Sequence, residues 1–214
     1  MKRRTTALSA IAAVALLGGA ATTVAVADDG PSGSSKAASQ SSVRVEDDGV
    51  SDAQENADEA KGAKIKAEDA IAAALKHTSG TAAGADLDSD DGRLVWEVDV
   101  IGGGNTWHHV DVDPGTGKVL SSHVEKDDDD DGDAARVASA LKGASTSAQD
   151  AARAAADKGV VTSVDADDDG VVKAWEVETT SSNGKQQDWR VDLRSGSVTV
   201  DHSADDEGDD GDDD

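Results

Sequence analysis

The chain has 214 residues, enough for one or two small domains, and 45 acidic against 20 basic residues give it a formal net charge of −25. This charge excludes ordinary electrostatic binding to nucleic acid or to an anionic membrane surface, and it favours partners with basic patches. Because Cys is absent, disulfides, Cys-ligated metals and a lipid-modified N-terminal cysteine are also excluded.

The first 27 residues have the pattern of a secretory signal peptide. A basic start precedes an apolar run at 7–21, and Ala25-Val26-Ala27 forms an A-x-A cleavage site. We expect cleavage between Ala27 and Asp28, and hence a protein that is secreted or held in the cell envelope, with no stable transmembrane segment. The alternative is an uncleaved anchor, although the strongly apolar part is short for a bilayer.

The next elements are a linker and a helix. Residues 28–61 are rich in Ser, Asp, Gly, Ala and Glu without apolar periodicity, so we expect a flexible, disordered linker. An amphipathic helix is predicted at 65–77, where apolar residues recur with helical spacing. Acidic residues lie at its start, and Lys76 and His77 lie at its end, as the helix dipole favours.

Three strands are predicted after this helix. Residues 94–100 alternate between apolar and polar, which is typical of a half-buried strand. A Gly-rich turn leads to a partner strand at 107–113. Pro114-Gly115-Thr116-Gly117 then forms a tight turn before a last strand at 118–124.

The same order recurs in the second half of the chain. Apolar Ala residues predict a helix at 148–156, which Thr146 or Ser147 can cap. Trp96-Glu97-Val98 recurs as Trp175-Glu176-Val177, and Val110-Asp111-Val112 recurs as Val191-Asp192-Leu193. This alignment of the two halves makes Trp189 correspond to His108.

We therefore predict an α+β fold of two tandem modules, at 62–124 and 143–202. Each is expected to be one helix packed on its own sheet of three or four antiparallel strands. Residues 125–142 and 203–214 are acidic, so we expect a linker and a tail that stay disordered. The protein is expected to be a monomer.

The first module resembles the PepSY family. The matching residues lie at 67–71, at 96–100 and at 110–119, and the last block, Val-Asp-x-x-Thr-Gly-x-Val in type, is the most specific. The second module departs from the pattern, because Arg194-Ser195-Gly196-Ser197 stands where the Thr-Gly turn is expected.

The resemblance implies a helix on an antiparallel sheet and a non-catalytic module. It also implies that the module binds and restrains secreted peptidases, as in the propeptides of thermolysin-like metallopeptidases. An extracellular peptidase is thus the expected partner, and the family brings no catalytic residues. We expect the turn at 113–118 and the strand after it to form the contact region.

One calcium motif competes with a plainer interpretation. The EF-hand expression is matched by Asp165, Asp167, Asp169 and Glu176, with Gly170 at the sharp turn. An EF-hand needs a helix on each side, whereas apolar residues at 160–164 precede the motif and an alternating strand follows it. We therefore prefer an acidic hairpin turn, and expect no cofactor beyond weak Ca²⁺ binding.

No other pattern points to a metal or to catalysis. His108 and His109 are neighbours on a strand, so their side chains point to opposite faces and cannot readily chelate together. His109 and Asp111 could share a face, but no third ligand is evident. No Ser stands in a nucleophile motif, so we expect no enzymatic activity.

Three hypotheses follow from the sequence. The first is a secreted module that binds or inhibits extracellular peptidases, which rests on the resemblance. The second is an acidic cell-envelope protein with weak Ca²⁺-binding capacity, because hard cations prefer oxygen ligands. The third is a membrane-anchored sensor that keeps its N-terminal segment. Capture of partners from culture fluid separates the first two, and cell fractionation tests the third.

Overall fold

The computed structural model describes residues 40–45, 50–90, 92–124, 131–166 and 172–201. The elements in chain order are α2 Asp52–Gly62, α3 Ala67–His77, β1 Thr81–Asp90, β2 Arg93–Ile101, β3 Trp107–Val112, β4 Val119–Val124, α4 Asp131–Lys142, α5 Ala148–Ala155, β5 Val160–Ala166, β6 Ala174–Thr180, β7 Gln186–Asp192 and β8 Val198–Val200. The fold class is α+β, as the sequence predicted.

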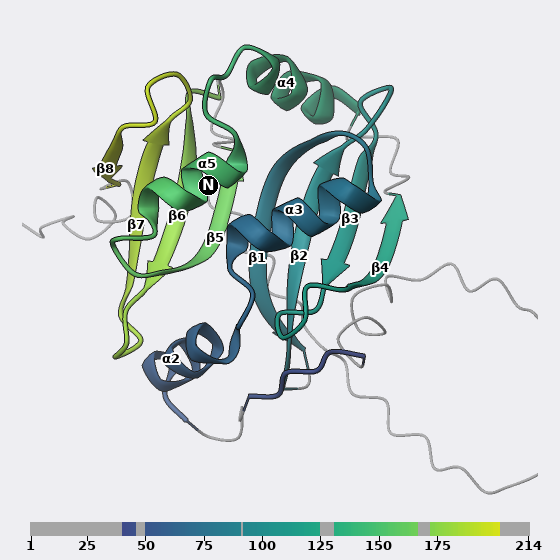
Figure 1. Cartoon of the computed structure of the whole chain (residues 1–214). Coiled ribbons are helices and arrows are strands. Elements are labelled where there is room, and N and C mark those ends of the chain that lie inside the picture. Colours follow the sequence, from purple (N-terminus) through teal and green to yellow (C-terminus); the bar gives the residue numbers. More distant parts are fainter. Residues whose placement is uncertain (1–39, 46–49, 91, 125–130, 167–171, 202–214) are drawn as a thin grey trace, which may run out of the picture. The chain divides into compact units, whose positions relative to one another are not determined.

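The eight strands of the described residues form one antiparallel sheet, in the order β4-β3-β2-β1-β5-β6-β7-β8 (Figure 1). The prediction of two separate sheets is therefore wrong. The first strands of the two halves, β1 and β5, pair through Gly84–Asp165, Ala85–Val164 and Asp86–Ser163, a junction called the seam below. Two separate sheets would have two more edges with unpaired backbone groups. Pairing at the seam provides hydrogen-bond partners for some of these groups.

The two halves repeat the same internal bonds. The indole Nε1 of Trp96 donates to the carbonyl of Ile65 over 2.9 Å, and Nε1 of Trp175 donates to the carbonyl of Thr146 over 3.0 Å. Two backbone N–H groups just before α3 donate to the carbonyl of Pro114, and two just before α5 donate to the carbonyl of Leu193. Each half thus ties the start of its inner helix to its own strands in the same way.

Strand pairing corrects the alignment of the halves at β7. Trp189 pairs with Val177 on β6 in the way that Val110 pairs with Val98 on β2. Trp189 therefore corresponds to Val110, and the predicted match to His108 is wrong by two residues. The error arose because a shift by two keeps every side chain on the same face of a strand, so the alternation alone does not reveal it.

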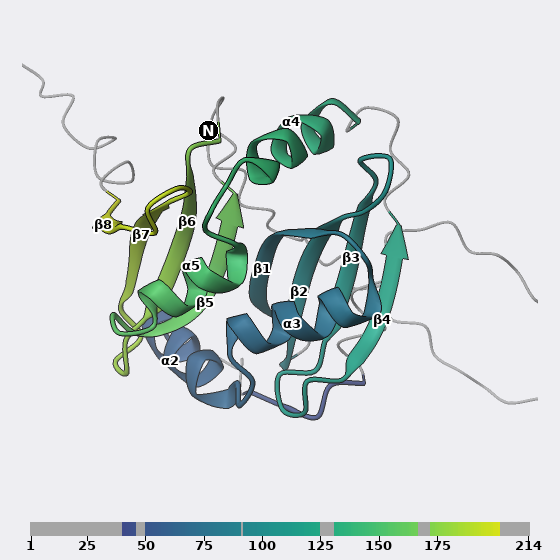
Figure 2. The ribbon, with the colours of Figure 1, turned by 45° about the horizontal axis from the view of Figure 1, so that its top comes forward.

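The inner helices α3 and α5 lie side by side on one face of the sheet (Figures 1 and 2). Their predicted apolar stripes are confirmed by the buried residues Ala67, Ala70, Ile71 and Ala74 in α3 and Ala148, Ala151, Ala152 and Ala155 in α5. The small Ala side chains let helix and sheet approach closely. The core between these layers contains Trp96 and Trp175, which are the largest fully buried side chains of the described residues.

Two helices occupy segments that the sequence predicted as flexible. α2 begins in the expected linker 28–61 and ends one residue beyond it, and α4 lies within the expected linker 125–142. Both bury small apolar side chains, namely Ala57 and Ala60 in α2 and Ala134, Val137 and Leu141 in α4. Their acidic composition hid these stripes, because burying a few Ala and Val residues is enough for a helix that packs on a neighbouring element.

Each of these outer helices packs against the opposite half. The carbonyl of Ala53 in α2 lies against Gly184 in the turn between β6 and β7. In the other direction, Leu141 of α4 lines a small cavity together with Thr81 and Ala82 of β1. The halves therefore exchange helices across the seam and fold as one unit.

Candidate functional site

The sheet has one long open edge, the strand β4. Its six residues pair with β3 on one side, and no strand of the described residues pairs with the other side. Ser122, His123 and Val124 are exposed. At the opposite end of the sheet, β8 has only three residues. Because a free edge presents unpaired N–H and C=O groups, β4 can accept an additional strand.

The turn before β4 is held by Asp113. Its Oδ1 accepts hydrogen bonds from the N–H of Gly115 at 2.7 Å and of Thr116 at 3.0 Å. Ser42 adds a bond from its hydroxyl at 2.7 Å and one from its N–H at 3.0 Å. Burial pushes the pKa of Asp113 upward, but these bonds outweigh it and lower the pKa. Gly117 completes the turn with a φ of +72°, a conformation that suits glycine.

The second half contains a looser version of this turn. Asp192 accepts from the N–H of Ser195 at 2.7 Å and from the N–H of Arg194 at 3.1 Å, and Gly196 has a φ of +68°. The sequence Arg194-Ser195-Gly196-Ser197 thus forms a turn of the same type despite its departure from the pattern. No segment equivalent to Ser42 contacts Asp192 among the hydrogen bonds of the described residues, and Asp192 is exposed.

The face of the sheet opposite α3 and α5 is strongly acidic. Residues that alternate with the core positions place many carboxylates there, among them those of Asp86, Glu97, Asp99, Asp111, Asp165, Glu176, Glu178 and Asp188. Arg190 on β7 lies 3.8 Å from Oε1 of Glu176 and 3.6 Å from Oδ2 of Asp201. We call this surface the acidic face. It would attract a basic partner.

Two histidines lie on the acidic face beside the open edge. The rings of His109 and His123 are stacked with centroids 4.9 Å apart. Nδ1 of His109 lies 2.6 Å from Oδ1 of Asp99. His109 is therefore engaged with Asp99 and His123, while its neighbour His108 pairs with Val100 and points to the other side.

Asp111 is a buried carboxylate, and its burial was not predicted from the sequence. It is 1% exposed, and Ser121 donates a hydrogen bond to its Oδ2. Its Oδ1 has no hydrogen-bond partner within the described part of the chain. Burial raises the pKa of Asp111, against the opposing effects of the Ser121 bond and of His123 and His109. No pattern in the sequence distinguishes this Asp from the many exposed ones.

Two further carboxyl groups with raised pKa values lie at the seam. Asp86 and Asp165 occupy corresponding positions of β1 and β5, and Ser163 hydrogen-bonds to both, at 2.6 Å from Oδ2 of Asp165. Burial, helped by neighbouring negative charges, raises the pKa of Asp86 to about 7. Burial and the charge of Asp86 together raise the pKa of Asp165 well above its usual value.

The calcium candidates are only partly described. Asp165 and Glu176 face each other on the adjacent strands β5 and β6, whereas Asp167 and Asp169 lie outside the described residues. The elements that flank the motif are strands, not the helices that an EF-hand requires. Across the residues with a described placement, no three His, Asp or Glu side chains are grouped closely enough to hold a metal ion.

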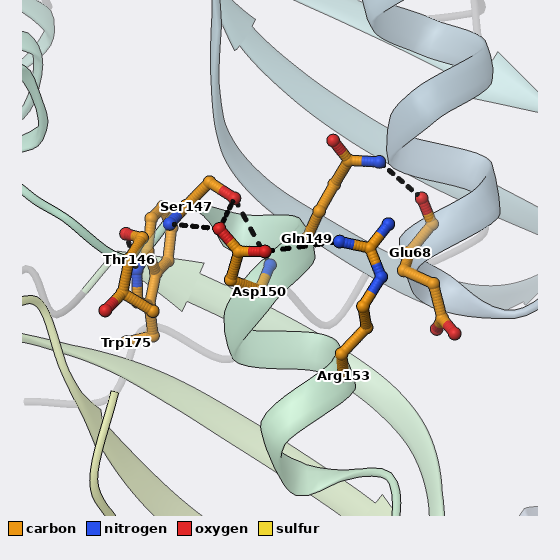
Figure 3. Close-up of polar contacts among 7 residues, drawn as sticks. All are labelled: Glu68, Thr146, Ser147, Gln149, Asp150, Arg153 and Trp175. Atoms are coloured by element: carbon orange, nitrogen blue, oxygen red, sulfur yellow. Dashed lines mark hydrogen bonds and ion pairs between the residues drawn. The ribbon is translucent and has the colours of Figure 1, made fainter. Parts of the chain in front are cut away.

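The polar contacts at the start of α5 serve the fold (Figure 3). Ser147 and Asp150 form the capping box that the sequence predicted, with Asp150 N–H donating to Oγ of Ser147 at 3.2 Å. Gln149 Nε2 donates to the carbonyl of Glu68 at 2.9 Å and so connects α5 to α3 (Figure 3). Arg153 lies 3.2 Å from Asp150. These bonds cap and join helices, and they do not form a catalytic grouping.

The expected signal peptide and its cleavage position at Ala27 and Asp28 lie outside the described residues. A search of the helices that are described finds none with the length and apolar character needed to cross a membrane.

The first half is a small α+β module, a helix on a four-stranded antiparallel meander that ends in an open edge. In a comparison with family models, residues 64–123 match the PepSY family, described as the peptidase propeptide and YPEB domain. This confirms the resemblance noted from the sequence. The matched residues include α3 and nearly all of β1 to β4.

Two further comparisons complete the picture. A crystal structure of a candidate lipoprotein from Clostridium difficile 630 is similar over 64% of this chain and 91% of its own, with 24% sequence identity and a TM-score of 0.42. The comparison with curated proteins gives no match.

Proposed function

We propose that this protein is a secreted, non-catalytic binding module that binds and restrains extracellular peptidases through its PepSY domain. The observation that carries the proposal is the open edge at β4, within the segment that matches a family named for peptidase propeptides. Peptidases commonly hold extended chains by main-chain hydrogen bonds, and an edge strand supplies the donors and acceptors for such pairing.

The structure supports the turn and strand at 113–124 as the contact region. Asp113 fixes the turn through four hydrogen bonds, so the start of β4 is held in one geometry before a partner arrives. A preorganised edge loses less conformational freedom on binding than a flexible one. The acidic face beside it would speed the approach of a basic partner, and this effect should weaken as salt rises.

The second half is proposed to be a degenerate PepSY-like domain with a supporting role. Its β5 covers the β1 edge of the first half, and its α4 packs against β1. The first half is thereby left with one open edge. In this proposal residues 62–124 bind the partner, and residues 143–202 stabilise them.

The site of action is proposed to be outside the cell or in the cell envelope. The support is the signal-peptide pattern of residues 1–27, with cleavage between Ala27 and Asp28, and the mature chain is expected to be a monomer.

Crosslinking in the secreted fraction tests this function. Tagged protein is added to culture fluid of the producing cells, crosslinked and recovered, and the captured proteins are identified. The proposal expects a peptidase among them, at a yield that falls when β4 is altered. Recovery without any peptidase would remove its main support.

A second candidate function is that of an acidic envelope protein with weak Ca²⁺-binding capacity. The acidic face favours it, because many carboxylates on one surface raise the local concentration of cations. The carboxylates come from separate strands of one sheet face, and high-affinity calcium sites instead surround the ion with six to eight oxygens. Binding in this case would be weak and spread over the face.

A further inference from the structure

The proposed function leaves open which kind of segment fits the edge, and the two sides of β4 differ in chemistry. By their pairing with β3, Val119, Ser122 and Val124 lie on the helix-covered side of the sheet, while Ser121 and His123 lie on the acidic face. A strand added beside β4 would continue this division, because side chains alternate between the two faces.

The helix-covered side of the edge carries two valines, with Ser122 between them. Val124 is 42% exposed, and Val119 is half-buried. Ile65, which precedes α3, extends this surface and lies 3.7 Å from the position that a Cβ at Gly117 would occupy. A partner strand that places apolar side chains on this side would cover Val124 and remove apolar surface from water.

The other side of the edge faces negative charge. Asp111 lies one strand inward from β4, and Glu97 and Asp99 lie two strands inward, on the same face as Ser121 and His123. With strands spaced about 4.8 Å apart, these carboxylates are roughly 10–15 Å from a strand added at the edge. At low ionic strength, where the screening length exceeds this range, acidic side chains on the partner would be repelled and basic ones would be attracted.

We propose that the β4 edge accepts an extended segment in which apolar and basic side chains alternate, the apolar ones toward α3 and the basic ones toward the acidic face. This inference rests on the proposed function and specifies its partner. It concerns β4 because β1 is paired with β5, and because β8 is half as long as β4.

Three labelled peptides of the length of β4, added to purified residues 28–214, test the alternation. One alternates Val and Lys, one has the same composition in two blocks, and one alternates Val and Glu. Fluorescence anisotropy should show that the alternating basic peptide binds several-fold more tightly than the other two. Equal binding of the block peptide would reduce the effect to bulk charge and overturn the proposal, as would no binding of the alternating basic peptide.

A matched pair of variants tests the location. Val124→Lys places a charge on the apolar side of β4, and Val200→Lys makes the same change on β8, where Val200 is 39% exposed. Val124→Lys should weaken binding of the alternating basic peptide about fivefold, because it removes a cross-strand contact with an apolar side chain of the peptide and places a charge there instead. Ser122→Lys, on the same side of β4, should act in the same direction. Equal weakening by Val200→Lys would place the contact elsewhere and overturn the proposal.

The outcomes separate this inference from the function on which it rests. Capture of a peptidase together with no preference among the peptides would leave the function standing and refute the alternation. A clear preference that Val124→Lys removes, without any captured peptidase, would refute the proposed partner while the specificity of the edge holds.

Discussion

Gly84 and Asp165 face each other across the seam, and the carboxylate of Asp165 occupies the space that a side chain at position 84 would need. The corresponding residue of the second half is Ser163, which instead hydrogen-bonds to Asp165. A glycine in β1 thus lets a carboxyl group of the second half lie over the first half, close to Asp86. The seam is short, with three residue pairs, and the two acids lie in its outer pairs, on either side of Ala85–Val164.

The first prediction concerns the pH dependence of this seam. Because the pKa of Asp86 is raised to about 7, the folded chain holds a proton that the unfolded chain releases near its ordinary value of 3.8. The stability from this proton is fully present below the unfolded pKa and is lost as pH rises through the folded one. The urea midpoint should therefore fall between pH 5 and pH 7.5, roughly, and then level off.

The control for this prediction uses the same chemical change elsewhere. Asp86→Asn and Asp165→Asn should each flatten the fall, because a neutral amide does not need a proton. Asp157→Asn, in the exposed turn after α5, should leave the profile as it is. A urea midpoint that stays constant or rises over this pH range in the unaltered protein would contradict the assignment.

The second prediction uses the two corresponding indoles. Trp96→Phe and Trp175→Phe each remove a hydrogen bond to the chain just before an inner helix and leave a carbonyl unpaired. Each should lower the free energy of unfolding by about 1–3 kcal/mol. Because the halves share one sheet and one core, thermal unfolding should stay a single transition in both variants. Two separate transitions would indicate independent modules.

The third prediction compares the two turns. Asp113→Ala should lower stability by about 2 kcal/mol, because Asp113 is buried and accepts four hydrogen bonds that hold the turn before β4. Asp192→Ala changes the same position of the exposed turn and should have a smaller effect. Denaturation in urea measures both. An equal loss would mean that the Ser42 contacts and burial contribute nothing.

The fourth prediction concerns calcium. Calorimetry on residues 28–214 should show weak binding that diminishes with salt, because Asp165 and Glu176 face each other on adjacent strands without a third ligand grouped with them in the described residues. Glu176→Gln should change it little. A single tight site lost in Glu176→Gln would establish the EF-hand motif as functional.

The elements with strong periodicity could be predicted from the sequence. Alternation of apolar residues identified β2 and β3, and helical spacing of Ala with Ile71 identified α3. Ser147 was one of the two residues predicted to cap α5, and the structure shows that it does so in a capping box with Asp150. In these elements local preference and tertiary packing agree.

The seam and the acids on it could not be predicted in the same way. β1 consists mainly of Ala, Gly, Asp and Ser, which have low strand propensity, and it is a strand because β2 and β5 pair with it on both sides. The pairing of β1 with β5 joins residues about 80 positions apart in sequence, a contact that no local pattern encodes. The raised pKa values of Asp86 and Asp165 follow from that contact, so they could not be predicted from the sequence either.

The central claim is that the PepSY domain restrains an extracellular peptidase through β4, and inhibition of secreted metallopeptidase activity tests it most directly. Purified residues 28–214 should slow hydrolysis as their concentration rises, without being cleaved quickly themselves. Val124→Lys should weaken the inhibition, and Val200→Lys should not. If no secreted peptidase is bound or slowed at micromolar protein, the claim fails and the acidic envelope function takes its place.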